Sequence, residues 1–138
     1  MSQETDTEID ARITFPECGV ELNCLIRHVV DDIYRICEHP TFAEDQVSFD
    51  DCAKMLNMGD QNFEFQEVTS KSNLKFAQYY INDEVSLMIA GLLEKTVRSN
   101  GYWQTDFGGC LSVYYDAEIF DPRPDLEALF QTTATNTT

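Results

Sequence analysis

The chain has 138 residues, 43% hydrophobic and 12% aromatic, and its 25 acidic and nine basic residues give a formal net charge of −16. This length predicts one domain with a real hydrophobic core, and the aromatic content excludes a fully disordered acidic chain. No apolar run is long enough to cross a bilayer, and no basic segment followed by an apolar one opens the chain as in a secretory signal.

The charge restricts the class of partner. Excess carboxylates repel bare nucleic acid and anionic membranes, so direct contact with either is not expected. The charged partners that fit are basic proteins, such as nucleic-acid-binding proteins and nucleases. Acidity that serves only solubility stays open as an alternative, because net charge concerns association rather than fold.

Both ends of the chain are predicted to be tails. Residues 1–10 alternate small polar residues with acids and predict a flexible acidic tail, and residues 132–138 predict a disordered C-terminal tail. Residues 11–131 are expected to form a single domain. At its start, residues 11–15 alternate apolar with polar positions and predict a short strand that ends at Pro16.

The strongest helical pattern covers residues 22–38, and Pro40 would end it. Apolar residues recur there at spacings of three and four: Leu22, Leu25, Ile26, Val29, Val30, Ile33, Tyr34 and Cys37. A second, short helix is expected over residues 48–57, because Ser48 and Asp51 approximate a capping box.

The middle of the chain gives weaker signals. Residues 61–68 alternate Phe63 and Phe65 with polar residues and predict a half-buried strand. Residues 74–81 suit either a strand or a helical turn.

A second long helix is expected over residues 84–98, with Asn82 or Asp83 as its cap and Gly101 just past its end. Beyond it, two aromatic and β-branched runs, 102–107 and 110–115, flank Gly108–Gly109 and predict a hairpin. Residues 125–131 predict a final short helix.

Together these elements predict an α+β fold. Two main amphipathic helices would pack on a small antiparallel sheet containing a β-hairpin in the C-terminal half.

The five cysteines are odd in number and form no Cys-x-x-Cys pair, which favours thiols in a reducing, cytoplasmic compartment. Cys24 and His28 would share a helix face and could supply two metal ligands, but the tight pairs of a structural zinc site are missing. A nucleophile built from Cys24, His28 and Asp31 or Asp32 would lack an oxyanion site. We therefore expect no enzyme, no cofactor and no metal, with metal binding by Cys24 and His28 left open.

The acidic residues are then expected to form a surface that binds a partner. Asp116–Asp125 lacks the pattern of a calcium loop, so cation binding there is left open. The expected partner-binding acids are Asp31, Asp32, Glu44, Asp45, Asp50, Asp51, Glu64, Glu67, Asp116, Glu118, Asp121 and Asp125. If folding gathers them on one face, the chain resembles acidic DNA-mimic and nuclease-inhibitor proteins in composition and size, a resemblance that assigns no residue.

Exposed aromatics of the hairpin would anchor such a complex: Tyr102, Trp103 and Tyr114. The leading hypothesis is thus an acidic inhibitor that occupies the basic groove of a nucleic-acid-binding protein or nuclease. The alternative is a non-catalytic adaptor or oligomerising protein, in which the hairpin edge could pair two copies into a homodimer. A small Cys/His metal protein is the third interpretation.

Overall fold

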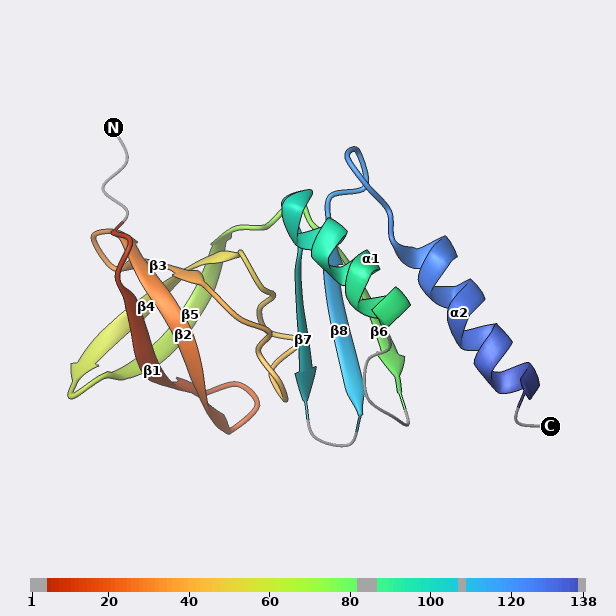
Figure 1. Cartoon of the computed structure of the whole chain (residues 1–138). Helices are drawn as coiled ribbons and strands as arrows, with labels where there is room; N and C mark the ends of the chain where they lie inside the picture. The colour runs from red at the N-terminus through yellow and green to blue at the C-terminus, as the bar shows by residue number, and fades with distance from the viewer. Residues whose placement is uncertain (1–4, 82–86, 107–108, 137–138) are drawn as a thin grey trace. The chain divides into compact units, whose positions relative to one another are not determined.

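The computed structural model describes residues 5–81, 87–106 and 109–136. The chain divides into two compact units, Met1–Ser72 and Asn73–Thr138. The first unit holds β1 (Glu8–Phe15), β2 (Val20–Val30), β3 (Ile33–Ile36), β4 (Cys52–Gly59) and β5 (Asn62–Ser70). The second holds β6 (Lys75–Tyr80), α1 (Leu87–Arg98), β7 (Tyr102–Asp106), β8 (Cys110–Tyr115) and α2 (Arg123–Asn136) (Figure 1).

The first unit is a closed barrel in which the five strands follow one another in chain order. Consecutive strands pair antiparallel, whereas β1 and β5 close the barrel by pairing parallel. This follows from the topology, since the first and fifth strands of an up-and-down meander run in the same direction. Alternate residues of the strands fill the interior, with Ile13, Ile26 and Met55 fully buried at its centre.

The prediction of a helix over residues 22–38 is wrong. This stretch forms β2 and β3, joined by a turn at Asp31-Asp32 in which Asp31 has φ 48°. The apolar spacing of three and four also contains a period of two, which buries Cys24 and Ile26 in the barrel. β-branched residues are frequent in this segment, and they favour strands when both periods fit.

The helix expected over residues 48–57 is also wrong. The contact expected of its cap does form, because the Asp51 carboxylate accepts the Ser48 backbone N–H at 2.9 Å. It closes a turn, however, and the chain then enters β4. Gly59, two residues past the expected helix, lies in the hairpin between β4 and β5 with φ 90°.

The second unit is a three-stranded antiparallel sheet in the order β6-β8-β7. Helix α1 lies across one face of this sheet (Figure 1), and α2 contributes Leu126 to the same apolar cluster as Leu93, Leu111 and Val113. The β7–β8 hairpin confirms the predicted one, with Gly109 at φ 76°; Phe107 and Gly108 lie outside the described residues. The ambiguous segment over residues 74–81 is a strand.

The expected α+β class is therefore wrong: the protein is mostly β, with a closed barrel and two short helices of 12 and 14 residues. The expected start of the second helix and its caps, Asn82 or Asp83, lie outside the described residues. Strand β1 begins inside the segment expected to be an acidic tail, and α2 extends into residues 132–138. The expectation of a single domain stays a prediction, because a division into two compact units does not show that either unit folds without the other. Among the described helices, neither is long and apolar enough to span a membrane.

Candidate functional site

An acidic groove lies in the first unit beside the pairing of β1 with β5. We call it the seam groove. Its volume is about 530 Å³, and its lining comprises four acids, Glu17, Asp45, Glu64 and Glu67, with Pro16, Gln46, Phe65, Gln66 and Val68. This volume is within the range of pockets that bind ligands.

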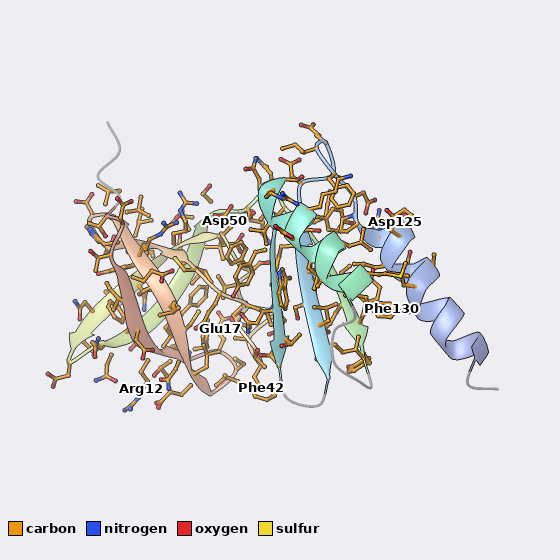
Figure 2. The ribbon with its side chains drawn as sticks, in the orientation of Figure 1. Arg12, Glu17, Phe42, Asp50, Asp125 and Phe130 are labelled. Carbon is orange, nitrogen blue, oxygen red and sulfur yellow. The ribbon has the colours of Figure 1, made fainter. Side chains whose placement is uncertain are left out.

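Three segments position the groove. Pro16 and Glu17 stand in the turn after β1 (Glu17 is labelled in Figure 2). Asp45 belongs to a turn whose flanking residues, Ala43 and Val47, are buried in the barrel core and are joined by a backbone hydrogen bond of 3.2 Å. The third wall is β5. The turn of Asp45 and strand β5 are thus fixed by core packing, so two of the three walls belong to the folded barrel.

Ion pairs with the groove carboxylates are absent from the described residues. Glu64 accepts one hydrogen bond from the Gln66 amide at 3.1 Å. Four like charges around one concavity favour a cation entering it, and the effect weakens with salt where the groups are exposed. The half-buried ring of Phe65, 5.0 Å from that of Phe15, adds an apolar surface.

Five other predicted acids of this unit lie outside the groove lining. Asp31 is exposed in the β2–β3 turn, and Asp32 forms a 3.9 Å ion pair with Lys54. Glu44 lies 3.8 Å from the buried imidazole of His39. Asp32 is thus already partnered by a base, so a binding protein would gain less from it.

Asp50 and Asp51 are structural. Asp51 is only 3% exposed, and its carboxylate accepts the backbone N–H of Ser48 at 2.9 Å and of Ser72 at 2.7 Å. Asp50 forms a 3.2 Å ion pair with Arg35 and accepts the Ser72 hydroxyl at 3.2 Å. Both fasten the loop before β4 to Ser72, two residues past the end of β5, and neither presents a free charge.

The remaining predicted acids belong to the second unit. Asp116 caps its own turn by accepting the Glu118 N–H at 3.1 Å, while the Glu118 side chain is exposed. Hydrogen bonds from Arg123, the shortest 2.9 Å, hold the pKa of Asp121 below its usual range. Asp125 lies in the first turn of α2, where a carboxylate is favoured by the helix dipole (Figure 2). Asp116, Asp121 and Asp125 therefore serve local structure, whereas no such role is shown for the Glu118 carboxylate among the described residues.

The predicted aromatic anchors do not form one exposed patch. Trp103 packs against the apolar cluster beneath α1 and α2. Tyr114 is 2% exposed, with its ring 4.8 Å from that of Phe76 and 6.4 Å from that of Tyr102. Tyr102 also donates its hydroxyl proton to Gln104 at 2.7 Å. Tyr102 and Trp103 are adjacent in β7, so their side chains point to opposite faces of the sheet.

Cys24 and His28 are not adjacent as they would be on a helix. They lie four residues apart on a strand, which separates them by roughly 13 Å. Burial is the main cause that raises the pKa of Cys24 to about 12, and the His28 ring instead forms a 2.7 Å hydrogen bond with the Asp31 carbonyl. No group of three or more His, Cys, Asp or Glu able to hold a metal occurs among the described residues.

Six of the nine residues that line the seam groove were not predicted as binding residues, among them Glu17 and Phe65. No role was predicted for Glu17, and Phe65 was placed only in a half-buried strand. Pro16 itself is the available signal: a proline at the end of a first strand stops backbone pairing there. Without the barrel topology, however, the sequence does not show that the turn of Asp45 and strand β5 lie beside Pro16.

Comparisons with known proteins add the fold alone. No family model and no curated protein matches the chain. A solved structure described as a novel crystal structure of a hypothetical protein from Neisseria gonorrhoeae is similar, with a TM-score of 0.55 at 14% identity. The similarity covers 95% of this chain and 91% of the other.

Proposed function

We propose that this protein is a non-catalytic binding protein that recognises a basic protein through the acidic barrel unit. The observation that carries the proposal is the seam groove, with four carboxylates that no basic residue neutralises in the described part of the chain. The charge distribution supports it, since residues 1–72 contain sixteen acids against five bases, and residues 73–138 contain nine against four.

Electrostatic attraction of this kind acts mainly on the rate of association and on specificity. Bare nucleic acid would be repelled, so the most specific form of the proposal is an inhibitor. The acidic unit would occupy the basic groove of a nucleic-acid-binding protein or nuclease, in the place of the phosphate backbone. No disulfide joins any of the five cysteines, all within the described residues, which suits a reducing, cytoplasmic setting.

Affinity capture from the source cell tests this proposal, using the wild type and two variants of equal charge. The groove variant carries Glu17→Gln, Asp45→Asn, Glu64→Gln and Glu67→Gln. The control variant carries four changes at exposed acids of the same unit that lie outside the groove lining: Glu8→Gln, Asp10→Asn, Asp31→Asn and Asp60→Asn.

The wild type and the control variant should retain a basic protein that high salt releases, and the groove variant should lose most of it. Release of the same protein by duplex DNA would support the inhibitor form. Recovery of only neutral proteins that survive high salt, or equal recovery on both variants, would overturn the proposal.

Self-association is a second candidate, favoured by one observation in the second unit. An apolar pocket of about 500 Å³ lies between α1 and α2, and Met88 at its edge is 67% exposed. If this pocket joins two copies, sedimentation should show a dimer that Met88→Glu converts to a monomer. A wild type that remains monomeric at high concentration would remove this candidate.

A further inference from the structure

The parallel seam of the barrel is short. β1 and β5 pair over only three positions, Arg12 with Asn62, Ile13 with Phe63 and Thr14 with Glu64. The reason lies in the sequence of the turn that follows. Pro16 has no N–H to donate, and the chain reverses into β2 immediately after it.

Residues 65–70 of β5 are consequently paired on one side only. They form a ladder with β4, and in the described chain no backbone hydrogen bond reaches their other edge from either neighbouring turn. Alternate residues of a strand direct their N–H and C=O groups to opposite edges. Apart from the Phe65 carbonyl, which accepts the Gln66 side-chain amide at 3.5 Å, this segment therefore presents backbone donors and acceptors without a second strand partner along the floor of the seam groove, which is the arrangement to which a further strand can add.

The side chains of β5 define what that further strand would carry. Phe65 and Val68 pack toward the barrel core, while Glu64 and Glu67 lie on the outer face, with Gln66 as an extra residue where the register with β4 shifts. An added strand would place alternate residues on these two faces. Apolar residues would face Phe65 and Val68, and basic residues would face the glutamates.

The opposite wall agrees with this pattern. Glu17 and Asp45 line the same groove and extend the negative charge to the side where the outward residues of an added strand would reach. A second copy of this acidic chain would bring like charges to the edge, which disfavours self-pairing there. The same negative charges attract a basic strand.

We propose that the seam groove takes an extended segment of alternating basic and apolar residues, bound as a sixth strand along residues 65–70 of β5. This inference deepens the proposed function and rests on it, since it specifies how the basic partner is held. Backbone hydrogen bonds would supply affinity that does not depend on sequence, and the four carboxylates would select the charge.

The test uses an eight-residue peptide of alternating arginine and valine, with two backbone-methylated forms. In one form the amides of the four arginines are N-methylated, and in the other those of the four valines. Only one of these sets can face β5, because the two sets point to opposite edges of the peptide strand. Affinities are measured by calorimetry at low salt.

We expect the unmodified peptide to bind, one methylated form to lose affinity about tenfold or more, and the other to change little. The groove variant should bind the unmodified peptide more weakly than the control variant of equal charge. On binding, the amides of residues 65–70 that face the groove should exchange with solvent more slowly, as followed by nuclear magnetic resonance.

The failures of the two proposals are distinguishable. Three results would overturn strand addition and leave the proposed function standing. They are equal loss of affinity in both methylated forms, unchanged amide exchange, and no binding of the peptide while a basic protein is still captured. Absence of both the peptide complex and the captured protein would overturn both. Equal binding by the groove and control variants would show that the peptide senses only overall charge, which also overturns strand addition.

Discussion

Asp51 offers the sharpest test of how the barrel is held together, because one buried carboxylate fastens two separate segments. It accepts the backbone N–H groups of Ser48 and Ser72 at 2.9 and 2.7 Å. A hydrogen bond to a charged group contributes about 1.5–3 kcal/mol to stability. Asp51→Ala removes both, and because Ser48 and Ser72 are half-buried, water can restore part of the loss.

We therefore expect Asp51→Ala to lower the free energy of unfolding by about 3 kcal/mol, and Asp51→Asn, which keeps one acceptor oxygen, by about half of that. With a urea dependence of about 1.5 kcal/mol per M, the alanine variant would unfold about 2 M earlier. Asp45→Asn is the control, since Asp45 is exposed in the neighbouring turn and should change stability by less than about 0.5 kcal/mol.

Urea unfolding should be followed by far-ultraviolet circular dichroism, because the single tryptophan, Trp103, lies in β7 and its fluorescence reports the second unit. A loss below about 1 kcal/mol for Asp51→Ala would refute the reasoning, since it would mean that the two backbone N–H groups are as well satisfied by water. An equal loss in Asp45→Asn would attribute the effect to charge alone.

Three further outcomes follow from burial and backbone geometry. Iodoacetamide at about pH 8 should label exposed Cys18 long before buried Cys24, whose pKa of about 12 leaves almost no thiolate; peptide mass spectrometry would reveal equal labelling if this is wrong. The buried hydroxyl of Tyr79 has no hydrogen-bond partner among the described residues, so Tyr79→Phe should be neutral or stabilise by up to about 1 kcal/mol in urea unfolding near pH 7. Burial is the main cause that raises the pKa of Tyr79 from 10.0 to about 12, so the folded state holds this proton more tightly, and stability should fall between these pH values, less steeply in the variant. Gly109→Ala should lower the melting temperature, at a cost of about 1–3 kcal/mol, because Gly109 has φ 76° and a Cβ there would collide with a facing carbonyl; Gly91→Ala, with open space around it in α1, should stabilise instead, and the same sign for both would contradict the argument.

The local parts of the fold could be predicted from the sequence. Gly109 between two aromatic and β-branched runs identified the β7–β8 hairpin, and the alternation of Phe63 and Phe65 identified β5. Both signals depend on residues close together in the chain, and turn chemistry is read over a few positions.

The error over residues 22–38 has a physical cause. Eight apolar residues fitted the helical period, but Asp31 at φ 48° marks a turn between two strands, and aspartate is one of the residues that tolerate this conformation. Reading Asp31-Asp32 as a turn would have divided the segment into two strands. Periodicity alone could not decide, because the partners that bury β2 lie on β1 and β3.

The seam groove illustrates the same limit. Asp45, Glu64 and Glu67 were predicted as binding residues from charge, yet Asp51 from the same list proves to be internal. Their assembly with Glu17 requires that β1 and β5 meet, which is a contact between strands about fifty residues apart.

That distance also sets the order of events when the chain folds. The hairpins between consecutive strands join neighbours in the sequence, whereas the closing pair must bring Arg12 to Asn62 and bear the loop-closure entropy of everything between them. Three residue pairs contribute little stabilisation against that entropy cost, so we expect this pairing to form after the hairpins. A guest strand laid along residues 65–70 would lengthen the ladder from the point where β1 leaves it. Binding and closure would then reinforce each other, and the occupied barrel would be the more stable one.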